Sequence, residues 1–198
     1  MNCLVTGGAG FIGSNLVEFL VKDGHEVTVL DDLSSGYRDN LLQGGLCEKI
    51  RFLQGDVRDE GLLREATRNQ EAVFHLAASV GNKRSIEHPL LDADINVMGT
   101  LKVLEAARFS GCRKVVFSSS AGIFGELKTL PIEENHPVEP DSPYGCTKLC
   151  AEKLCLAYAK LYDLEAVALR YFNVYGPRQR FDAYGNVIPI FVFQILRG

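Results

Sequence analysis

Short apolar runs alternate with longer amphipathic stretches along this chain of 198 residues. Runs rich in β-branched residues, such as "EVTVL" and "KVVFS", predict strands, whereas apolar residues at helical spacing predict helices. Strands are predicted at residues 2–6, 26–30, 50–54, 72–76, 114–118 and 166–170. Helices are predicted at residues 11–23, 60–69, 90–110 and 144–162, and in the final stretch "IPIFVFQILRG".

Strands that alternate with helices pair in parallel through right-handed crossovers, and the helices then cover both faces of the sheet. The pattern therefore predicts an α/β fold with a doubly wound parallel sheet, that is, a Rossmann-like domain. Such folds bind their ligands at the carboxyl ends of the strands. One connection, residues 125–143, is long and polar and carries four prolines. A loop of this length in a compact domain is typical of a functional segment.

Composition and charge narrow the class of protein. Hydrophobic residues make up 46% of the chain and charged residues 23%, as in soluble globular proteins. The net charge of −4, without a run of Lys and Arg, argues against a nucleic-acid partner. No apolar run approaches the roughly 18 residues that span a bilayer, and the chain starts with a strand pattern rather than a signal segment. We therefore expect a cytoplasmic protein without a membrane partner.

The cysteines and histidines do not have the spacing of a metal site. None of the cysteines forms a CxxC pair, and the four histidines are scattered, so we predict no bound metal. Three cysteines fall in one predicted helix at spacings that suit packing better than bridging. All six are predicted to be small buried hydrophobic residues in a reducing cytosol: Cys3, Cys47, Cys112, Cys146, Cys150 and Cys155.

The stretch "TGGAGFIGSNL" places three glycines where the first predicted strand gives way to the first helix. Gly7 permits a tight turn, Gly10 lets a pyrophosphate approach the backbone, and Gly13 lets the helix pack on the strand. The helix N-terminus adds free N–H groups and a partial positive charge. Asp31 ends the next strand pattern, where its carboxylate would accept hydrogen bonds from a ribose 2′-hydroxyl and repel a 2′-phosphate. The pattern predicts binding of NAD rather than NADP; the alternative is a plain glycine-rich turn with Asp31 as a helix cap.

The stretch "YGCTK" supplies a candidate reacting group. Tyr144 and Lys148 are four residues apart, so on a helix their side chains lie on one face. A free tyrosine has a pKa of about 10, too high for a base at neutral pH. The nearby ammonium, together with the positive nicotinamide ring, is predicted to lower that pKa. Tyr144 would then act as a general base toward a substrate hydroxyl.

The glycine spacing Gly-x-x-Gly-x-x-Gly and the motifs that follow it resemble the extended short-chain dehydrogenase/reductase family. These motifs are "GDVRD" at 55–59, "HLAA" at 75–78, "SSSAGIFG" at 118–125, "YGCTK" at 144–148 and "RYFNVYGPRQ" at 170–179. The resemblance covers essentially the whole chain. Within the family, the chain looks most like the nucleotide-sugar 4-epimerases that act on UDP-hexoses and UDP-N-acetylhexosamines.

The resemblance implies a set of NAD contacts along the chain. The residues are Gly7, Gly10, Phe11, Ile12, Gly13, Asp31, Asp32, Ser35, Gly36, Asp56, Val57, Leu76, Ala77, Ala78, Asn96, Ser118, Tyr144, Lys148 and Phe172. Among them, Asp56 would meet the adenine, or it could be a turn-forming Asp before a helix. Asn96 would face the nucleotide cleft, or it could be a buried amide that satisfies backbone groups.

The resemblance also implies a reaction. Tyr144, Lys148 and Ser120 would be catalytic, and Ser120, Tyr144 and Asn173 would contact a UDP-sugar. Tyr144 would remove the 4-hydroxyl proton while the C4 hydride passes to NAD. The 4-keto sugar would then turn over and take the hydride back on its other face. The related sugar 4,6-dehydratases carry an acidic pair where this chain has Ala121 and Gly122, which disfavours dehydration.

Some alternatives stay open at this level. UDP-glucuronate decarboxylases share much of the scaffold, and Lys83 and Arg84 are either a solvated pair or contacts to a substrate phosphate or carboxyl. Family members continue for on the order of 110 more residues, about one small domain. We therefore expect an NAD-binding domain at residues 1–171 and the start of a substrate-binding region at 172–198, or else a NAD-binding module without turnover.

The two long predicted helices are those with which the family forms homodimers, and we predict a homodimer.

Overall fold

The computed structural model describes residues 1–42, 46, 48–180 and 187–197. Its centre is a parallel sheet with the strand order β3-β2-β1-β4-β5-β6. The strands are β1 (Asn2–Thr6), β2 (Glu26–Asp31), β3 (Ile50–Gln54), β4 (Ala72–His75), β5 (Lys114–Ser120) and β6 (Glu165–Tyr171). The helices are α1 (Phe11–Lys22), α2 (Asp39–Leu42), α3 (Glu60–Ala66), α4 (Asn82–Glu87), α5 (Pro89–Ala93), η2 (Asp94–Gly99), α6 (Thr100–Phe109), η3 (Ala121–Ile123), α7 (Pro143–Leu161) and α8 (Val187–Arg197).

The strand order confirms the predicted doubly wound fold. β1 lies between β2 and β4, so the chain first winds outward to β3 and then returns to build the other half of the sheet. The carboxyl ends of β1, β2 and β4 are in register, because Thr6 pairs with both Leu30 and His75. A doubly wound sheet binds ligands at this reversal point. A ligand site is therefore expected at the loops that follow β1, β2 and β4.

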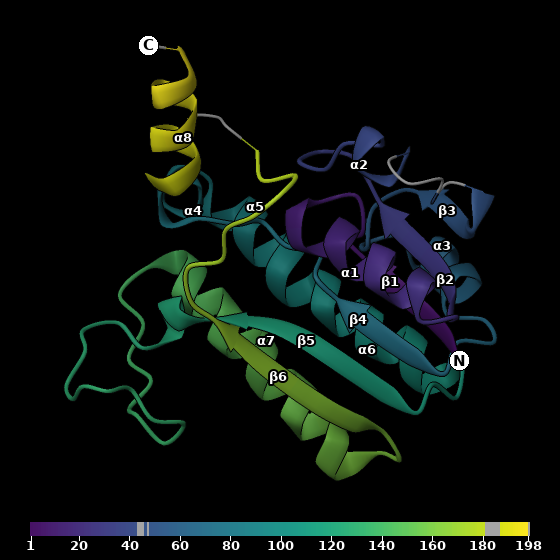
Figure 1. Cartoon of the computed structure of the whole chain (residues 1–198). Helices are drawn as coiled ribbons and strands as arrows, with labels where there is room; N and C mark the ends of the chain where they lie inside the picture. Colours follow the sequence, from purple (N-terminus) through teal and green to yellow (C-terminus); the bar gives the residue numbers. More distant parts are fainter. Residues whose placement is uncertain (43–45, 47, 181–186, 198) are drawn as a thin grey trace.

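Two apolar layers hold the helices on the sheet. Strand side chains alternate between the faces, so Leu4 joins one cluster while Cys3 and Val5 join the other. The first cluster lies under α3, α6 and α7, and the second lies under α1 and α2. Figure 1 shows these helices on opposite faces, with the carboxyl ends of the strands, the long loop before α7 and α8 all on the side away from the N-terminus.

The predicted helix at 90–110 differs from the structure. The segment is helical, but residues Asp94–Gly99 form a π-helical turn between α5 and α6. The periodicity of apolar residues did not reveal this turn, and short helices α2 and α4 also escaped prediction. A π turn adds one residue to an α-helix and is often found at functional sites.

The prediction for the cysteines is wrong in part. Cys3, Cys112 and Cys155 are buried, whereas Cys146 and Cys150 are exposed on α7, and Cys47 lies outside the described residues. Both exposed thiols lie on the face of α7 opposite to the side chains that pack on the sheet. Among the described residues, no group of His, Cys, Asp and Glu side chains could hold a metal ion.

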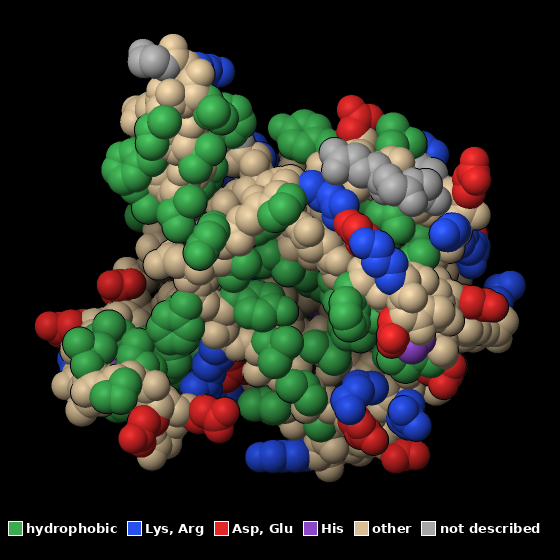
Figure 2. All heavy atoms as spheres, in the orientation of Figure 1, with side chains coloured by type: hydrophobic (Ala, Val, Ile, Leu, Met, Phe, Trp, Pro, Cys, Tyr) green, Lys and Arg blue, Asp and Glu red, His purple; other side chains and the backbone are tan. Residues whose placement is uncertain are grey.

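Apolar side chains are also exposed at the C-terminal end. On α8, Phe191, Ile195 and Leu196 are exposed, and Figure 2 shows hydrophobic side chains over much of this helix. No helix in the described part of the chain has the length and apolarity needed to cross a membrane.

Candidate functional site

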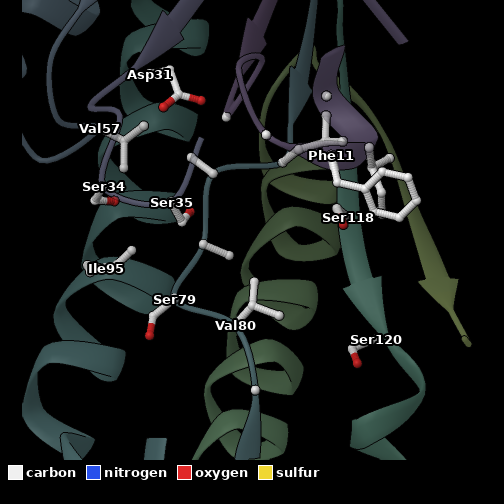
Figure 3. A pocket seen from close by; sticks show the side chains of 18 of the residues that line it. Phe11, Asp31, Ser34, Ser35, Val57, Ser79, Val80, Ile95, Ser118 and Ser120 are labelled. Carbon is white, nitrogen blue, oxygen red and sulfur yellow. The ribbon is translucent and has the colours of Figure 1, made fainter. Parts of the chain in front are cut away.

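A pocket of about 370 Å³ opens at the carboxyl ends of the strands. It is lined by most of the residues predicted to contact NAD or substrate: Gly7, Gly10, Phe11, Ile12, Gly13, Asp31, Asp32, Ser35, Asp56, Val57, Leu76, Ala77, Ala78, Ser118, Ser120, Tyr144, Lys148 and Phe172. Figure 3 shows Asp31 at one end of the pocket and Ser120 at the other. The pocket is thus elongated between an acidic end and the end that holds Tyr144.

The glycine turn leaves backbone, rather than side chains, at the pocket. Gly7 adopts φ +69, and a Cβ on it would lie 2.7 Å from the Ala77 nitrogen. A Cβ on Gly13 would lie 2.1 Å from the Gly7 carbonyl oxygen, so α1 packs against the turn. A Cβ on Gly10 would meet little besides the Gly7 oxygen, at 3.2 Å. No side chain caps the start of α1, so this end can accept an anion, and the turn fits a pyrophosphate.

Asp31 is held in place by the glycine turn itself. Its carboxylate accepts hydrogen bonds from the backbone of Ala9 (2.9 Å) and Leu33 (2.8 Å). Burial raises the pKa of this carboxyl, and the two backbone hydrogen bonds oppose that effect. Each oxygen keeps a free lone pair direction, so Asp31 can still accept a ribose hydroxyl.

Asp32 and Asp56 line the pocket, but other groups already engage their carboxylates. Asp32 accepts hydrogen bonds from the backbone and hydroxyl of Ser34. Asp56 pairs with the guanidinium of Arg58, which holds the pKa of Asp56 below its ordinary value. Val57, next to Asp56, is buried and offers an apolar surface.

Ser120 and Tyr144 flank the same glycine. A Cβ on Gly122 would lie 3.4 Å from the Ser120 hydroxyl and 3.6 Å from two ring carbons of Tyr144. Ser120 accepts the backbone N–H of Gly122 at 3.1 Å and so caps η3. A Cβ on Gly145 would lie 2.3 Å from the Gly122 carbonyl oxygen, so η3 packs tightly on the first turn of α7. This close packing brings the serine and the phenol together.

Burial governs the electrostatics of Tyr144 and Lys148 when no cofactor is bound. In the protein chain alone, burial raises the pKa of Tyr144, although hydrogen bonding with Ser120 acts in the opposite direction. Burial also lowers the pKa of Lys148 to about 8. The ammonium lies 4.6 Å from the ring centroid of Phe117. In the chain alone the pKa of Tyr144 is therefore raised, because the loss of hydration outweighs the hydrogen bond with Ser120.

We expect Lys148→Met to stabilise the protein without cofactor at pH 7. The pKa of Lys148 falls from 10.5 to about 8 on folding, so between these values the unfolded chain binds more protons and stability rises with pH. Below pH 8 the whole penalty is present, up to about 3 kcal/mol. Denaturant unfolding should therefore show a gain for the variant at pH 7 that shrinks by pH 10. Lys153→Met, at an exposed position of α7, is the control; an equal gain there would contradict the explanation.

Asn96 does not line the pocket, which corrects the prediction that it faces the cleft. It is 2% exposed. Its amide oxygen accepts the backbone N–H of Ser79 at 2.8 Å, and its amide nitrogen donates to the Ser79 carbonyl oxygen at 3.0 Å. Asp92 and Thr147 complete its surroundings. Asn96 thus fixes the backbone of a pocket-lining residue and links it to α7.

His75 joins the same buried region to the glycine turn. The hydroxyl of Thr100 donates to the Asn96 carbonyl oxygen at 2.6 Å, so its oxygen must accept from Nε2 of His75, 3.0 Å away. Nδ1 of His75 then accepts from the hydroxyl of Thr6 at 2.7 Å. Burial lowers the pKa of His75 to about 3, which keeps the ring neutral.

Two other predicted contacts lie outside the pocket lining, and some lining residues were missed. Gly36 packs behind the glycine turn, where a Cβ would lie 2.8 Å from the Ala9 carbonyl carbon. Asn173 is exposed and does not line the pocket. Arg84, for which a substrate contact was one of two alternatives, lines the pocket, and Ser34, Ser79, Val80, Ile95 and Tyr171 line it without having been predicted. Ser34, Ser79 and Val80 lie in loops, which carry no periodic signal in the sequence, whereas Ile95 lies in η2 and Tyr171 ends β6.

A comparison with known protein families shows which family the chain belongs to. The model of the NAD dependent epimerase/dehydratase family matches residues 3–198. The chain belongs to this family. Membership confirms the resemblance found in the sequence, and it agrees with the glycine turn and Asp31 as the elements of a dinucleotide site.

Relatives within the epimerase/dehydratase family have more than one activity. A UDP-glucose 4-epimerase of Mycolicibacterium smegmatis is 45% identical over 202 residues, which covers 100% of this chain and 64% of the relative. A UDP-N-acetyl-alpha-D-glucosaminuronate decarboxylase of Bacillus cytotoxicus is 38% identical and covers 99% of this chain and 61% of the relative. The structure of a Thermus thermophilus UDP-glucose 4-epimerase in complex with NAD superposes with a TM-score of 0.91 at 43% identity, over 100% of this chain and 63% of that one. The chain thus spans under two thirds of the length of these relatives.

Proposed function

We propose that this chain binds NAD and forms the catalytic part of a UDP-hexose 4-epimerase. The observation that carries the proposal is that one pocket joins the glycine turn and Asp31 at one end to Ser120, Tyr144 and Lys148 at the other. Relatives that are named UDP-glucose 4-epimerase support the choice of reaction. The absence of acidic side chains at Ala121 and Gly122 disfavours dehydration.

In this mechanism, the glycine turn and the first turn of α1 hold the pyrophosphate, and Asp31 accepts hydrogen bonds from the adenosine ribose. Bound NAD would supply the hydride acceptor and donor for C4 of the sugar. Tyr144 takes the proton of the 4-hydroxyl and later gives it back. Ser120, beside Tyr144, hydrogen-bonds the same substrate oxygen.

Lys148 supplies the positive charge that the Tyr144 phenolate needs. It lies on the same face of α7 one turn after Tyr144, and it is buried. A buried charge acts over a low dielectric and is felt more strongly than one in water. The raised pKa of Tyr144 in the chain alone implies that the base forms only when further positive charge is present, as an oxidised nicotinamide would provide.

The test of this function is a product analysis with purified protein and NAD. Conversion of UDP-glucose to UDP-galactose supports the proposal. Release of carbon dioxide from UDP-glucuronate, without epimerisation of any UDP-hexose, would instead favour a decarboxylase. Bound NAD with no turnover of any UDP-sugar would favour a NAD-binding module.

We expect the protein to bind NAD at least about 100-fold more tightly than NADP. The Asp31 carboxylate accepts a 2′-hydroxyl and repels a 2′-phosphate, and a difference of about 2.7 kcal/mol corresponds to this factor. Because burial raises the pKa of Asp31, the preference should weaken as the pH falls toward that pKa and the carboxyl is neutralised. Isothermal titration with both cofactors between pH 5 and 8 measures this. Equal affinity for NAD and NADP at pH 8 would show that Asp31 does not distinguish a ribose 2′-hydroxyl from a 2′-phosphate.

We also propose that the protein is a homodimer. Apolar side chains are exposed on the helices that the family uses for pairing, including Leu90, Met98 and Leu161. Pairing would also cover the exposed thiols of Cys146 and Cys150 on α7. Sedimentation at micromolar concentration should give the mass of two chains; a clean monomer would contradict this proposal.

A further inference from the structure

Glu152 extends the line of functional side chains on α7. Tyr144, Lys148 and Glu152 follow each other at intervals of four residues, so their side chains lie along one stripe of the helix. The stripe faces the sheet, and the side chain of Glu152 is 1% exposed. A carboxylate this deeply buried needs partners for both of its oxygens.

Two side chains from neighbouring strands satisfy this carboxylate. The hydroxyl of Ser119 donates to Oε2 at 2.6 Å. The guanidinium of Arg170 forms a fork on both oxygens, at 2.8 Å to Oε1 and 3.2 Å to Oε2. Burial opposes ionisation, but these hydrogen bonds from Arg170 and Ser119 outweigh it and hold the pKa of Glu152 below its ordinary value. Glu152 therefore carries a charge that ties the ends of β5 and β6 to α7.

Arg170 also holds the long loop before α7. Its third donor bonds the carbonyl oxygen of Glu134 at 2.9 Å, and its guanidinium carbon lies 5.3 Å from the ring centroid of Phe124. Phe124 in turn stacks on Phe172, with 6.0 Å between ring centroids. One guanidinium thus contacts the loop, the segment after β5 and, through Phe124, the segment after β6.

Contacts of His136 also stabilise the loop from within, beside this guanidinium. His136 is buried and packs edge-on against Phe124, with ring centroids 5.3 Å apart. Its Nε2 accepts the backbone N–H of Lys128 at 3.1 Å, so Nδ1 carries the proton and donates to the Pro137 carbonyl oxygen at 2.8 Å. The loop is therefore tied across its own width next to its contact with Arg170.

Ser119 of this network itself lines the pocket, and the network also holds the neighbours of other lining residues. Ser120 follows Ser119, and Tyr171 and Phe172 follow Arg170; all three line the pocket. A buried ion pair is seldom a net gain in stability, since apolar residues of similar volume are often as stable or more so. The network is therefore expected to fix the positions of the residues it holds rather than to raise the stability of the protein.

We propose that Glu152 and Arg170, with Ser119, form a clamp that positions Ser120, Tyr171 and Phe172 and orders the loop at the substrate end of the pocket. The role in turnover rests on the epimerase function proposed above. Glu152 and Arg170 are positioning residues: they act through the residues next to them, and a shift of about 1 Å in reacting groups can cost 100-fold in rate.

The test replaces the charged pair by an apolar pair, Glu152→Met with Arg170→Met. The matched control is Lys114→Met with Glu165→Met, which removes an exposed ion pair between the opposite ends of the same two strands. Three quantities are measured for each protein: the melting temperature, the NAD dissociation constant, and amide hydrogen exchange of residues 118–138. Turnover of UDP-glucose is followed at several substrate concentrations.

For the clamp variant, we expect exchange in 118–138 to rise by at least tenfold and kcat/KM to fall by about 100-fold. The NAD dissociation constant should stay within threefold of that of the unchanged protein, and the control should match the unchanged protein in every measurement. Unchanged exchange, or full turnover despite raised exchange, would overturn the proposal.

The proposal is also tested if the double variant does not fold or if the unchanged protein shows no turnover. If the double variant does not fold, Arg170→Lys replaces it: the charge is kept but the fork is lost, and the same rise in exchange is expected. If the unchanged protein turns over no UDP-sugar, the epimerase function fails. The exchange measurement then decides the clamp alone, and a rise confined to the clamp variant supports it.

Discussion

Replacing Tyr144 with phenylalanine is expected to lower the rate of UDP-hexose epimerisation by about 1,000-fold while NAD still binds. The variant keeps the ring that packs against Gly122 but loses the oxygen that would take the proton, and general base catalysis contributes roughly 100- to 10,000-fold. Since burial raises the pKa of Tyr144, the rate of the unchanged protein should rise with pH up to the pKa of the phenol in its cofactor complex. Initial rates between pH 6 and 10 measure both effects.

Tyr158→Phe is the matched control for this experiment. Tyr158 lies on the same helix, but its hydroxyl donates to Glu105 at 2.7 Å, and it does not line the pocket. Its loss should leave the rate within about twofold of that of the unchanged protein. If Tyr144→Phe kept a tenth or more of the activity, Tyr144 would not be the base.

Replacing Gly13 with alanine is expected to cost about 3 kcal/mol or more in the free energy of unfolding and to abolish NAD binding. The new Cβ would lie 2.1 Å from the Gly7 carbonyl oxygen and 2.8 Å from the Gly8 Cα. Both are backbone atoms of the turn that would cradle the pyrophosphate, so neither can move away without opening the site. Urea unfolding and cofactor titration measure the two losses.

Gly61→Ala separates this clash from the general effect of adding a methyl group. Gly61 is an exposed residue of α3, and a Cβ there would meet only the Asp59 side chain, at 3.3 Å. The change should alter stability by less than about 1 kcal/mol, because alanine favours the helix but its methyl group lies close to the capping oxygen of Asp59. A Gly13→Ala protein as stable as the unchanged one would mean that α1 and the turn separate easily.

The strands and the cofactor end of the pocket could be predicted because they depend on local rules. Each strand is a short apolar run, and a turn that brings backbone close to a phosphate needs glycine at fixed positions. The predicted strand at 114–118 extends to Ser120 in the structure. Polar residues at the end of a strand break the apolar pattern while the backbone pairing with β6 continues.

The remaining features depend on contacts between distant segments. Whether Asn96 faces the cleft is decided by Ser79, whose backbone N–H donates to the amide oxygen, and by Thr147, which accepts from the amide nitrogen. The direction of the Tyr144 pKa is set by burial, and burial is a property of the packed molecule. Glu152 was missed, although its position four residues after Lys148 was the available signal; its partners Ser119 and Arg170 come from two other strands.

The π turn at Asp94–Gly99 makes this segment sensitive to length as well as to composition. Such a turn holds one residue more than the regular helix needs, so loss of a single residue there would let the segment relax into an uninterrupted helix. The residues on either side of the turn would keep their relative facing, because the wide turn takes up the extra residue locally. Asp92 would still face Thr147, whereas Asn96, which lies in the turn itself, would change its position relative to Ser79. Homologous chains that are one residue shorter at this point should therefore keep the packing of α5 on α7 and differ in how the backbone of Ser79 is held.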